Sequence, residues 1–404
     1  MEIENAKQDI QKLLSCFSEA FSRPSFKIFS SFIIGFIQLG KEVHTSSMVQ
    51  SLTHCFLHRS LSSFTRFLGK NVWTMEQVAG TALDQFFDTL RIKAHSVLFV
   101  IVDDTIVEKT GKKIPGCSWH KDHTKNKYVF GHQWVLLALL YKDFLLPRWA
   151  KLYHSKGTKG LGPFQTKITL AQKMLQTLRL PVPCKVYLLA DSWYWAKALA
   201  RVCRKCGYHM ISQLKSNSVL WISGKHTKVT TLSSLPSAYR EISLLLYGKN
   251  KTLKIARFVG VVKGFGKVAV VVVKEKRKKT CYLVSTNLHL SPLDIIRYYA
   301  KRWKIEQMIK DLKQRLGFGD YQVRNPQAIQ RHVALALLSY FVLIFLKILQ
   351  WLRDKHVSLD SSIRLLAFHV RRHILLQNIT VVLKTMRIHF KQNILDSYLE
   401  QLCT

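Results

Sequence analysis

Three acidic side chains stand where the sequence could bring carboxylates together around divalent metal ions. Asp104 directly follows the apolar run SVLFVIVD, Asp191 closes the run VYLLAD, and Glu306 lies in a segment with helical periodicity. Mg²⁺ prefers oxygen ligands, and two such ions can stabilise the attacking and leaving oxygens of a phosphoryl transfer. The acids therefore predict a site for two Mg²⁺ ions, with Mn²⁺ as a substitute, and Asp103 competes with Asp104 for the first position.

A stripe of polar residues accompanies the third acid. Its members follow at spacings of three, four and seven residues: Tyr299, Arg302, Glu306 and Lys313. In an α-helix these steps return to nearly the same face. The apolar neighbours of the stripe should bury the opposite side and direct the polar face toward a sheet. A guanidinium and an ammonium in this place could hold phosphates on either side of a scissile bond, whereas the plain alternative is a solvated helix with ion pairs.

The two aspartates fall at the ends of predicted buried strands. We expect strands at 96–103, 134–141, 144–153, 186–191 and 208–214, with helices at 165–179 and 193–206. This β-β-β-α-β-α-β series is the ribonuclease-H-like arrangement of an α/β fold. Acids at the carboxyl ends of neighbouring parallel strands can meet at one sheet edge.

An insertion separates this series from the third acid. Residues 219–290 alternate apolar and polar positions between turn signals, which predicts a mainly-β inserted subdomain. A long helix should begin after Ser291-Pro292 and run to Gly317. The predicted core is thus divided into 91–218 and 291–325.

Helical regions should flank the core on both sides. Residues 1–90 carry helical periodicity with basic and aromatic groups, so they are either a DNA-binding region or an ordinary bundle with a solvated face. Residues 326–404 are also predicted to be helical. Within them, the apolar segment 333–352 is long enough to span a bilayer. Its interspersed polar residues favour a buried core helix, with a membrane anchor as the alternative.

The charge balance points to a polyanionic partner. The chain has 62 Lys and Arg against 24 Asp and Glu, a formal net charge of +38. Because this excess is spread through a large fold, nucleic acid is favoured over an anionic membrane or a ribosome-like assembly. Lys112 and Lys121 belong to a basic stretch beside the first acid and are DNA-binding candidates, with a solvated charge run as the alternative. Eight irregularly placed cysteines and no N-terminal signal pattern indicate a cytoplasmic protein.

Three short motifs contain these acids: VDDT at 102–105, LLADSWY at 188–194 and Y-x2-R-x3-E-x6-K at 299–313. Together they resemble the acidic motifs of DDE transposases of bacterial insertion sequences. The last signature is similar to that of the cut-and-paste branch in which a β insertion precedes the Glu. The resemblance covers roughly residues 20–350.

The resemblance implies an enzyme that cuts DNA at transposon ends and joins the freed 3′-OH to target DNA, through a hairpin intermediate. It implies that the three acids are catalytic, and that a homodimer binds terminal inverted repeats near the bacterial nucleoid. The DNA contacts that it implies around the Glu are Tyr299, Arg302 and Lys313. Trp221, the only Trp of the insertion, is a candidate for stacking on a flipped base, with a core Trp as the alternative.

Two other functions fit the same residues. A ribonuclease-H-like DNA endonuclease would cut without joining, because attack by water and by a 3′-OH need the same metal chemistry. A catalytically idle protein derived from a transposase would bind DNA without using the acids. The helix signature and the insertion favour the transposase.

Overall fold

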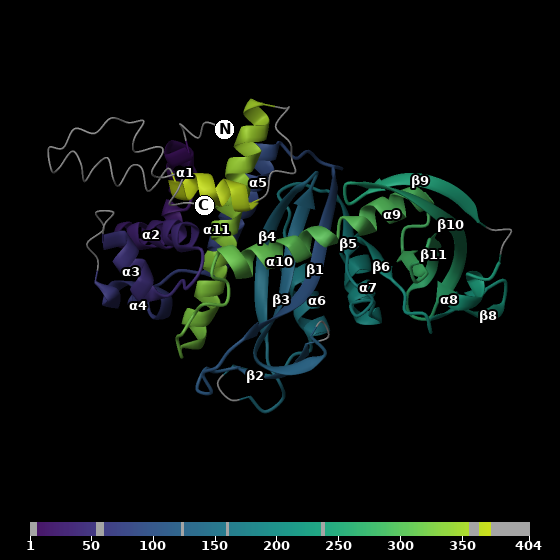
Figure 1. Cartoon of the computed structure of the whole chain (residues 1–404), viewed down its shortest axis with the longest axis horizontal. Coiled ribbons are helices and arrows are strands. Elements are labelled where there is room, and N and C mark those ends of the chain that lie inside the picture. Colours follow the sequence, from purple (N-terminus) through teal and green to yellow (C-terminus); the bar gives the residue numbers. More distant parts are fainter. Residues whose placement is uncertain are drawn as a thin grey trace.

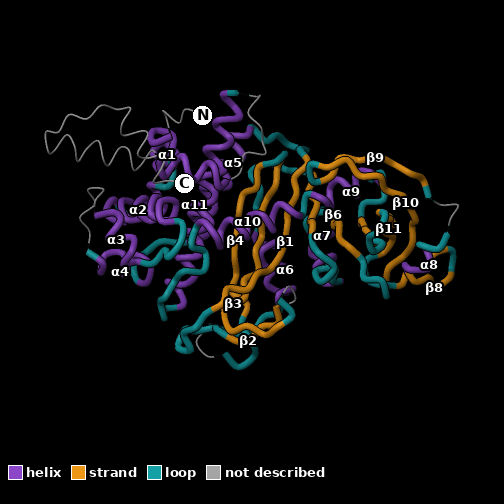
Figure 2. Tube along the Cα trace, in the orientation of Figure 1, coloured by secondary structure: helices purple, strands orange, loops and turns teal. Residues whose placement is uncertain are grey.

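One large mixed sheet lies beside helices contributed by both ends of the chain (Figure 1). The structure is a computed structural model that describes residues 6–53, 60–122, 125–158, 161–235, 239–354 and 363–372. Figure 2 shows the strands in the middle and on one side of the molecule, with most of the helices on the other side.

The N-terminal region is helical, as predicted for its described residues. Its elements are α1 (Ala6–Ser15), the 3₁₀ turn η1 (Ser18–Ala20), α2 (Arg23–Leu39), α3 (Thr45–Thr53), α4 (Leu61–Gly69) and α5 (Met75–Leu90). Their apolar faces share a core of fully buried aromatic rings, among them Phe29, Phe32, Phe36, Phe64 and Phe67. Burial of these rings stabilises the bundle far more than helix propensity does.

The first half of the sheet contains the predicted strands. They are β1 (Val97–Glu108), β3 (Lys127–Tyr141), β4 (Phe144–Tyr153), β5 (Lys185–Leu189) and β6 (His209–Gln213), in the order β4-β3-β1-β5-β6. β1 is antiparallel to β3 and parallel to β5, which is parallel to β6. Helices α6 (Lys167–Thr177) and α7 (Lys197–Lys205) connect the later strands.

A further strand, β2 (Ser118–Asp122), forms in the basic stretch where we expected only a loop. It pairs with the start of β3, so that Lys121 lies opposite Tyr128. Alternation is weak in this short polar segment, and cross-strand pairing with β3 decides its structure.

The insertion is mainly β, as predicted, but it continues the core sheet. Its strands are β7 (Val219–Ile222), β8 (Lys225–Lys228), β9 (Arg240–Leu246), β10 (Lys249–Val262), β11 (Gly266–Glu275) and β12 (Cys281–Ser285), with the short helix α8 (Val229–Leu232). β12 pairs with β6, and Val284 lies opposite Ser212. Backbone hydrogen bonds therefore run from the core strands into the insertion.

The long helix predicted after Ser291 is divided in two. Helix α9 (Pro292–Ala300) and helix α10 (Trp303–Arg315) are joined by a tight turn. In that turn the Lys301 N–H donates to the Tyr298 carbonyl and the Arg302 N–H to the Tyr299 carbonyl, each at 3.0 Å. α9 packs on the strands β6, β10, β11 and β12, while α10 packs on β1 and β4. The turn accommodates this change of direction.

Helix α11 (Pro326–Arg353) is the apolar segment that is long enough to cross a membrane. Of its most apolar window, 83% is buried inside the fold. It packs against β4 on one side and against α1, α2, α4 and α5 on the other, which supports the core-helix interpretation. Residues 363–372 are helical too, and the rest of the predicted C-terminal helical region, 355–362 and 373–404, lies outside the described residues.

A buried polar network joins β3 to the linker between α10 and α11. The Tyr321 hydroxyl lies 2.7 Å from His132 Nδ1 and accepts from Trp134 Nε1 at 3.2 Å. His132 Nε2 lies 2.9 Å from the Pro115 carbonyl, which can only accept, so this nitrogen carries the proton. In the same region His332 Nε2 donates to the Gly317 carbonyl at 2.9 Å. Both imidazoles are therefore neutral donors.

These histidines make the fold sensitive to acid. Burial lowers the pKa of both His132 and His332 to about 4. In the unfolded chain a histidine takes up a proton near pH 6.5, whereas the buried imidazoles of the folded protein stay neutral down to about pH 4. Protonation therefore stabilises the unfolded state, and the free energy of unfolding falls as the pH drops from about 6.5 toward 4. We expect a loss on the order of 2 kcal/mol for each histidine between pH 7 and 5. Thermal unfolding across this range measures it, and His332→Gln should flatten the slope; an unchanged slope would contradict the assignment.

Candidate active site

Asp103 and Asp104 project from opposite faces of β1. Successive side chains of a strand alternate between the two faces of a sheet. Asp103 accepts a hydrogen bond at 3.1 Å from Arg302, which begins α10. Asp104 accepts one at 3.1 Å from Lys167 of α6. The two carboxylates therefore meet different helices, one on each face.

Arg302 connects the first and third acidic positions. Its Nη1 donates to Asp103, and its Nη2 donates to Glu306, one helical turn further along α10. Asp103 and Arg302 are largely buried, with side chains 19% and 18% exposed, whereas Glu306 is 45% exposed. Burial raises the pKa of Asp103 to about 7, against the opposing effect of Arg302. Burial thus disfavours the charged form of Asp103 more than Arg302 favours it.

Asp191 follows β5, which lies beside β1 in the sheet. Its Oδ1 accepts hydrogen bonds from the backbone N–H groups of Trp193 and Tyr194, at 2.9 and 3.2 Å. Its carbonyl accepts from the Ser212 hydroxyl at 2.8 Å. The negative charge of Asp191 contributes to the raised pKa of Asp103. Asp191 thus lies close enough to Asp103 for its charge to act on that carboxyl group.

Asp104 is enclosed by a network of its own. Lys167 and Gln133 donate to its Oδ2, at 3.1 and 2.6 Å, and the Tyr194 hydroxyl donates to its Oδ1 at 3.0 Å. Sequence reasoning did not single out these three donors. Tyr194 stands inside the LLADSWY motif and could have been noticed, whereas no local signal marks Gln133 or Lys167. Asp104 is thus paired with one cation, Lys167, and accepts from two neutral donors.

The other members of the predicted stripe also reach the sheet. The Tyr299 hydroxyl donates to Gln213 Oε1 at 3.4 Å, and Lys313 Nζ donates to the Ile106 carbonyl at 2.6 Å. Burial raises the pKa of Tyr299 to about 12 and lowers the pKa of Lys313. The stripe therefore does face β1 and β6, although the turn at Lys301 interrupts its helix. That its members contact DNA stays a prediction.

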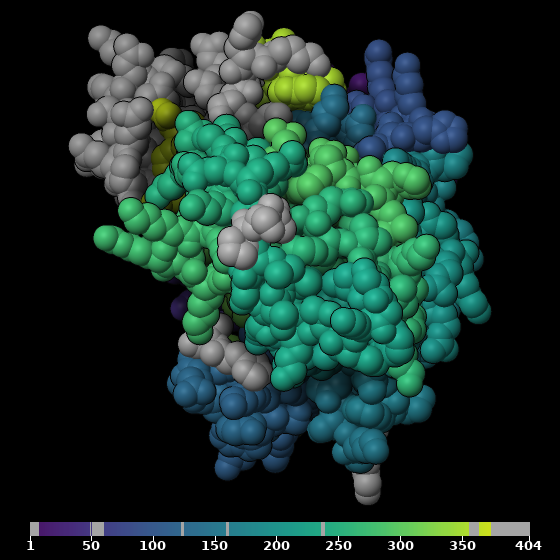
Figure 3. All heavy atoms as spheres, turned by 90° about the vertical axis from the view of Figure 1, so that its right-hand side faces the viewer, coloured from purple at the N-terminus to yellow at the C-terminus, as the bar shows by residue number. Residues whose placement is uncertain are grey.

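The remaining DNA-binding candidates lie on the surface. Trp221 on β7 is 48% exposed, and its ring centroid is 4.2 Å from that of His226. This exposure speaks against a core Trp. Lys112 and Lys121 are exposed near the end of β1 and on β2. Figure 3 looks onto the insertion, coloured teal and green, and the blue segment around β2 protrudes beneath it.

The side chains of the acidic residues are of the kind that binds a divalent metal, but they are not arranged around a common point. Within the residues that the structure describes, no three acidic, histidine or cysteine side chains converge closely enough to hold an ion. Arg302 stands between Asp103 and Glu306 instead. Carboxylate oxygens are the donors that Mg²⁺ prefers, and a buried carboxylate with a raised pKa gains from a nearby cation. Asp103, Asp191 and Glu306 could therefore hold Mg²⁺.

A known protein family matches the part of the chain that contains these acids. The transposase DDE domain family matches residues 97–342, which extend from β1 into α11. No curated protein matches the sequence. The match covers more than half of the chain and includes all the acids described above. The chain therefore belongs to the transposase DDE domain family, whose members act in DNA transposition and generally use divalent metals.

Proposed function

We propose that this chain is a DNA transposase that cuts at transposon ends and joins the freed 3′-OH to target DNA. One observation carries the assignment of the site: Arg302 binds Asp103 and Glu306 at once, so that acids from β1 and α10 face each other beside Asp191. The strand order β4-β3-β1-β5-β6 supports a ribonuclease-H-like core. The proposed acids are Asp103, Asp191 and Glu306, so the geometry favours Asp103 over the Asp104 that the motif suggested.

The side chains of the site would have different roles in an in-line displacement at phosphorus. Two divalent ions, when bound to the acids, would supply stabilisation of the charge on the attacking and leaving oxygens. The Arg302 guanidinium presents a fork of donors that fits a phosphate as well as a carboxylate. It could therefore turn from the acids to a phosphate of the scissile strand. Tyr299 and Lys313 would hold the adjoining backbone.

The same site can serve each step in turn. Water first attacks the phosphorus at the transposon end, the bond to the 3′ oxygen breaks, and that oxygen takes up a proton. We propose that the 3′-OH then attacks a phosphodiester of the opposite strand, whose bond to its own 3′ oxygen breaks as the hairpin forms. Water attacks the hairpin phosphodiester and releases the 3′-OH again. This 3′-OH attacks a phosphodiester of the target DNA, and the target 3′ oxygen leaves with a proton. The exposed basic residues Lys112 and Lys121 lie next to the end of β1 and would guide the duplex. The enzyme would act as a homodimer on two ends in a bacterial cytoplasm.

Trp221→Ala is expected to weaken binding of hairpin DNA without unfolding the protein. Stacking of one base on an aromatic ring contributes about 1–3 kcal/mol, so the affinity should fall by roughly tenfold or more. Because Trp221 is 48% exposed, the unfolding midpoint should hardly move. Fluorescence anisotropy with a labelled hairpin measures the affinity. Trp119→Ala, on a 68% exposed ring of β2, is the matched control; an equal loss in both variants would refute a specific role.

The function is tested with the purified full chain, Mg²⁺ or Mn²⁺, and DNA that carries the native terminal inverted repeats. We expect nicks at the ends, a hairpin species and joined products, all abolished by a chelator. Two paired ends should copurify with two copies of the chain. Cleavage without any joined product would indicate an endonuclease of the same fold. Tight DNA binding with neither reaction would indicate an idle transposase derivative.

A further inference from the structure

Strand β4 contains an irregularity at Arg148. Leu137 of β3 lies opposite Trp149, and the next residue, Ala138, lies opposite Pro147. Arg148 is therefore the extra residue of a β-bulge. Bulges commonly re-aim a side chain, and they recur beside functional sites.

Within the part of the chain that the structure describes, two nitrogens of the Arg148 side chain are buried without a hydrogen-bond partner. The residue is 9% exposed, and its Nε and Nη1 have no hydrogen-bond partner among the described residues. Its guanidinium carbon lies 4.1 Å from the centroid of the Trp149 ring. Burial lowers the pKa of Arg148 to about 10, although Asp84 and Glu76 act in the opposite direction. A buried cation with unsatisfied donors is costly to maintain, so this one gains from an anion.

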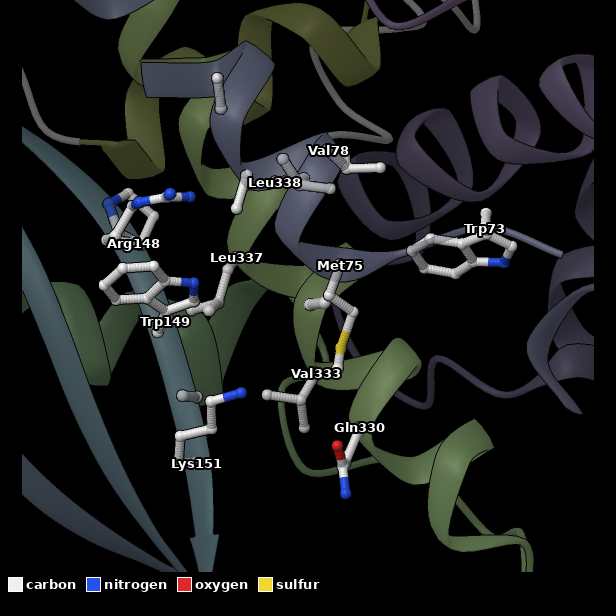
Figure 4. A pocket seen from close by; sticks show the side chains of 15 residues that line it. Trp73, Met75, Val78, Arg148, Trp149, Lys151, Gln330, Val333, Leu337 and Leu338 are labelled. Carbon is white, nitrogen blue, oxygen red and sulfur yellow. The ribbon is translucent and has the colours of Figure 1, made fainter. Parts of the chain in front are cut away.

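Two hollows meet at Arg148. The smaller, of about 30 Å³, lies between β4, α5 and α11, and Figure 4 shows Arg148, Trp149 and Lys151 facing the side chains of those helices. It has room for about one water molecule. The larger, of about 380 Å³, lies between β4, α5 and α6. That volume falls in the range of small-ligand pockets.

The larger hollow is basic. Its lining includes Arg148, Lys151 and Lys173, against the single acid Glu76. Lys151 lies 3.7 Å from Glu76, and Asp84, outside the lining, acts on Arg148. The lining itself carries three cations against one acid. Gln165 Oε1 is buried there without a partner, and an amide can turn to present its NH₂ group instead. A phosphate matches this set, because its oxygens accept from the guanidinium fork, the ammonium and the amide together.

We propose that the hollow lined by Arg148, Lys151, Gln165 and Lys173 binds a phosphate group, carried either by the DNA backbone or by free phosphate or a nucleotide. The hollow lies on the face of the sheet that carries Asp104, whereas Asp103 meets α10 on the other face. Asp104 lies opposite Val135 of β3, and Val135 lies opposite Lys151. These three residues occupy one level of the sheet on neighbouring strands, and each Cβ points to the same face.

Thermal unfolding of the full chain without divalent metal tests the site. Inorganic phosphate is titrated against chloride at equal ionic strength. We expect the midpoint of the wild type to rise with phosphate, and the apparent affinity to fall tenfold or more in Arg148→Met and in Lys173→Gln. Lys205→Gln, at an exposed position on α7, should respond like the wild type. Lys173→Gln retains the buried arginine, so the test stands even if Arg148→Met fails to fold. Equal phosphate responses in all four proteins would overturn the proposal.

A second measurement identifies the source of the phosphate. Anisotropy of a short labelled duplex is recorded for the same variants. Weaker DNA binding in Arg148→Met and Lys173→Gln, but not in Lys205→Gln, would assign the hollow to the DNA backbone. Unchanged DNA binding together with a lost phosphate response would assign it to free phosphate or a nucleotide. Neither measurement requires cleavage, so failure of this proposal and failure of the transposase proposal are distinguishable.

Discussion

Asp103→Asn is expected to lower Mg²⁺-dependent cleavage of transposon ends by at least about three orders of magnitude. The substitution keeps the size of the side chain but removes the charge that binds Arg302 and would bind metal. Loss of about 4 kcal/mol of charge stabilisation in the transition state corresponds to a thousandfold in rate. Single-turnover cleavage of end-labelled DNA measures the effect. Asp191→Asn and Glu306→Gln should be equally defective.

Asp104→Asn tests which of the two adjacent aspartates is the first catalytic acid. Its carboxylate is neutralised by Lys167 and faces the other side of the sheet, so we expect a loss of about tenfold, from displacement of its donors. Asp143→Asn, on a surface pair with Lys304 at 3.4 Å, should cleave normally. Abolished activity in Asp104→Asn with substantial activity in Asp103→Asn would restore Asp104 as the first acid.

Arg331→Met is expected to destabilise the fold by at least about 3 kcal/mol, because it leaves buried carbonyl groups without donors. Arg331 is 3% exposed and docks α11 on the N-terminal helices. Its guanidinium donates to the four carbonyls of Phe67, Leu68, Asn71 and Trp73, at 2.7–3.2 Å. It also lies 4.4 Å from the centroid of the Trp73 ring.

Denaturant unfolding of this variant measures the change in free energy. The matched control is Arg353→Met, which breaks a pair with Asp9 at the far end of the same helix. The Arg353 side chain is 53% exposed, so this pair should contribute less than about 1 kcal/mol. Similar losses in the two variants would show that the buried carbonyls find other partners.

Local patterns predicted the strands that carry the aspartates and the stripe on the glutamate helix. They could not decide between Asp103 and Asp104, because both stand at the end of one apolar run and their roles depend on which face α10 covers. The choice between the two aspartates therefore depends on tertiary packing. The turn at Lys301 contains neither Gly nor Pro, so no residue announces it. The pairing of β12 with β6 joins segments that no local signal relates.

Arg148 likewise has no local sequence signal. A single arginine in an apolar stretch gives no sign of a bulge, since the bulge exists only in the register between β3 and β4. The sequence left Trp221 open between a base-stacking role and a core position, and its place on a short strand near the edge of the sheet leaves it half exposed. Apolar patterns predict helices and strands well, whereas the exposure of a side chain on a strand near a sheet edge depends on which other segments pack against that strand.

The packing of helix α11 determines which parts of the chain can be exchanged between related proteins. The helix follows the catalytic segments in the chain, yet it packs against α1, α2, α4 and α5 as well as β4. The first ninety residues therefore have no complete interior of their own. An exchange of the N-terminal helices therefore has to include the matching surface of α11. The N-terminal region and the catalytic core have to be transferred as one piece.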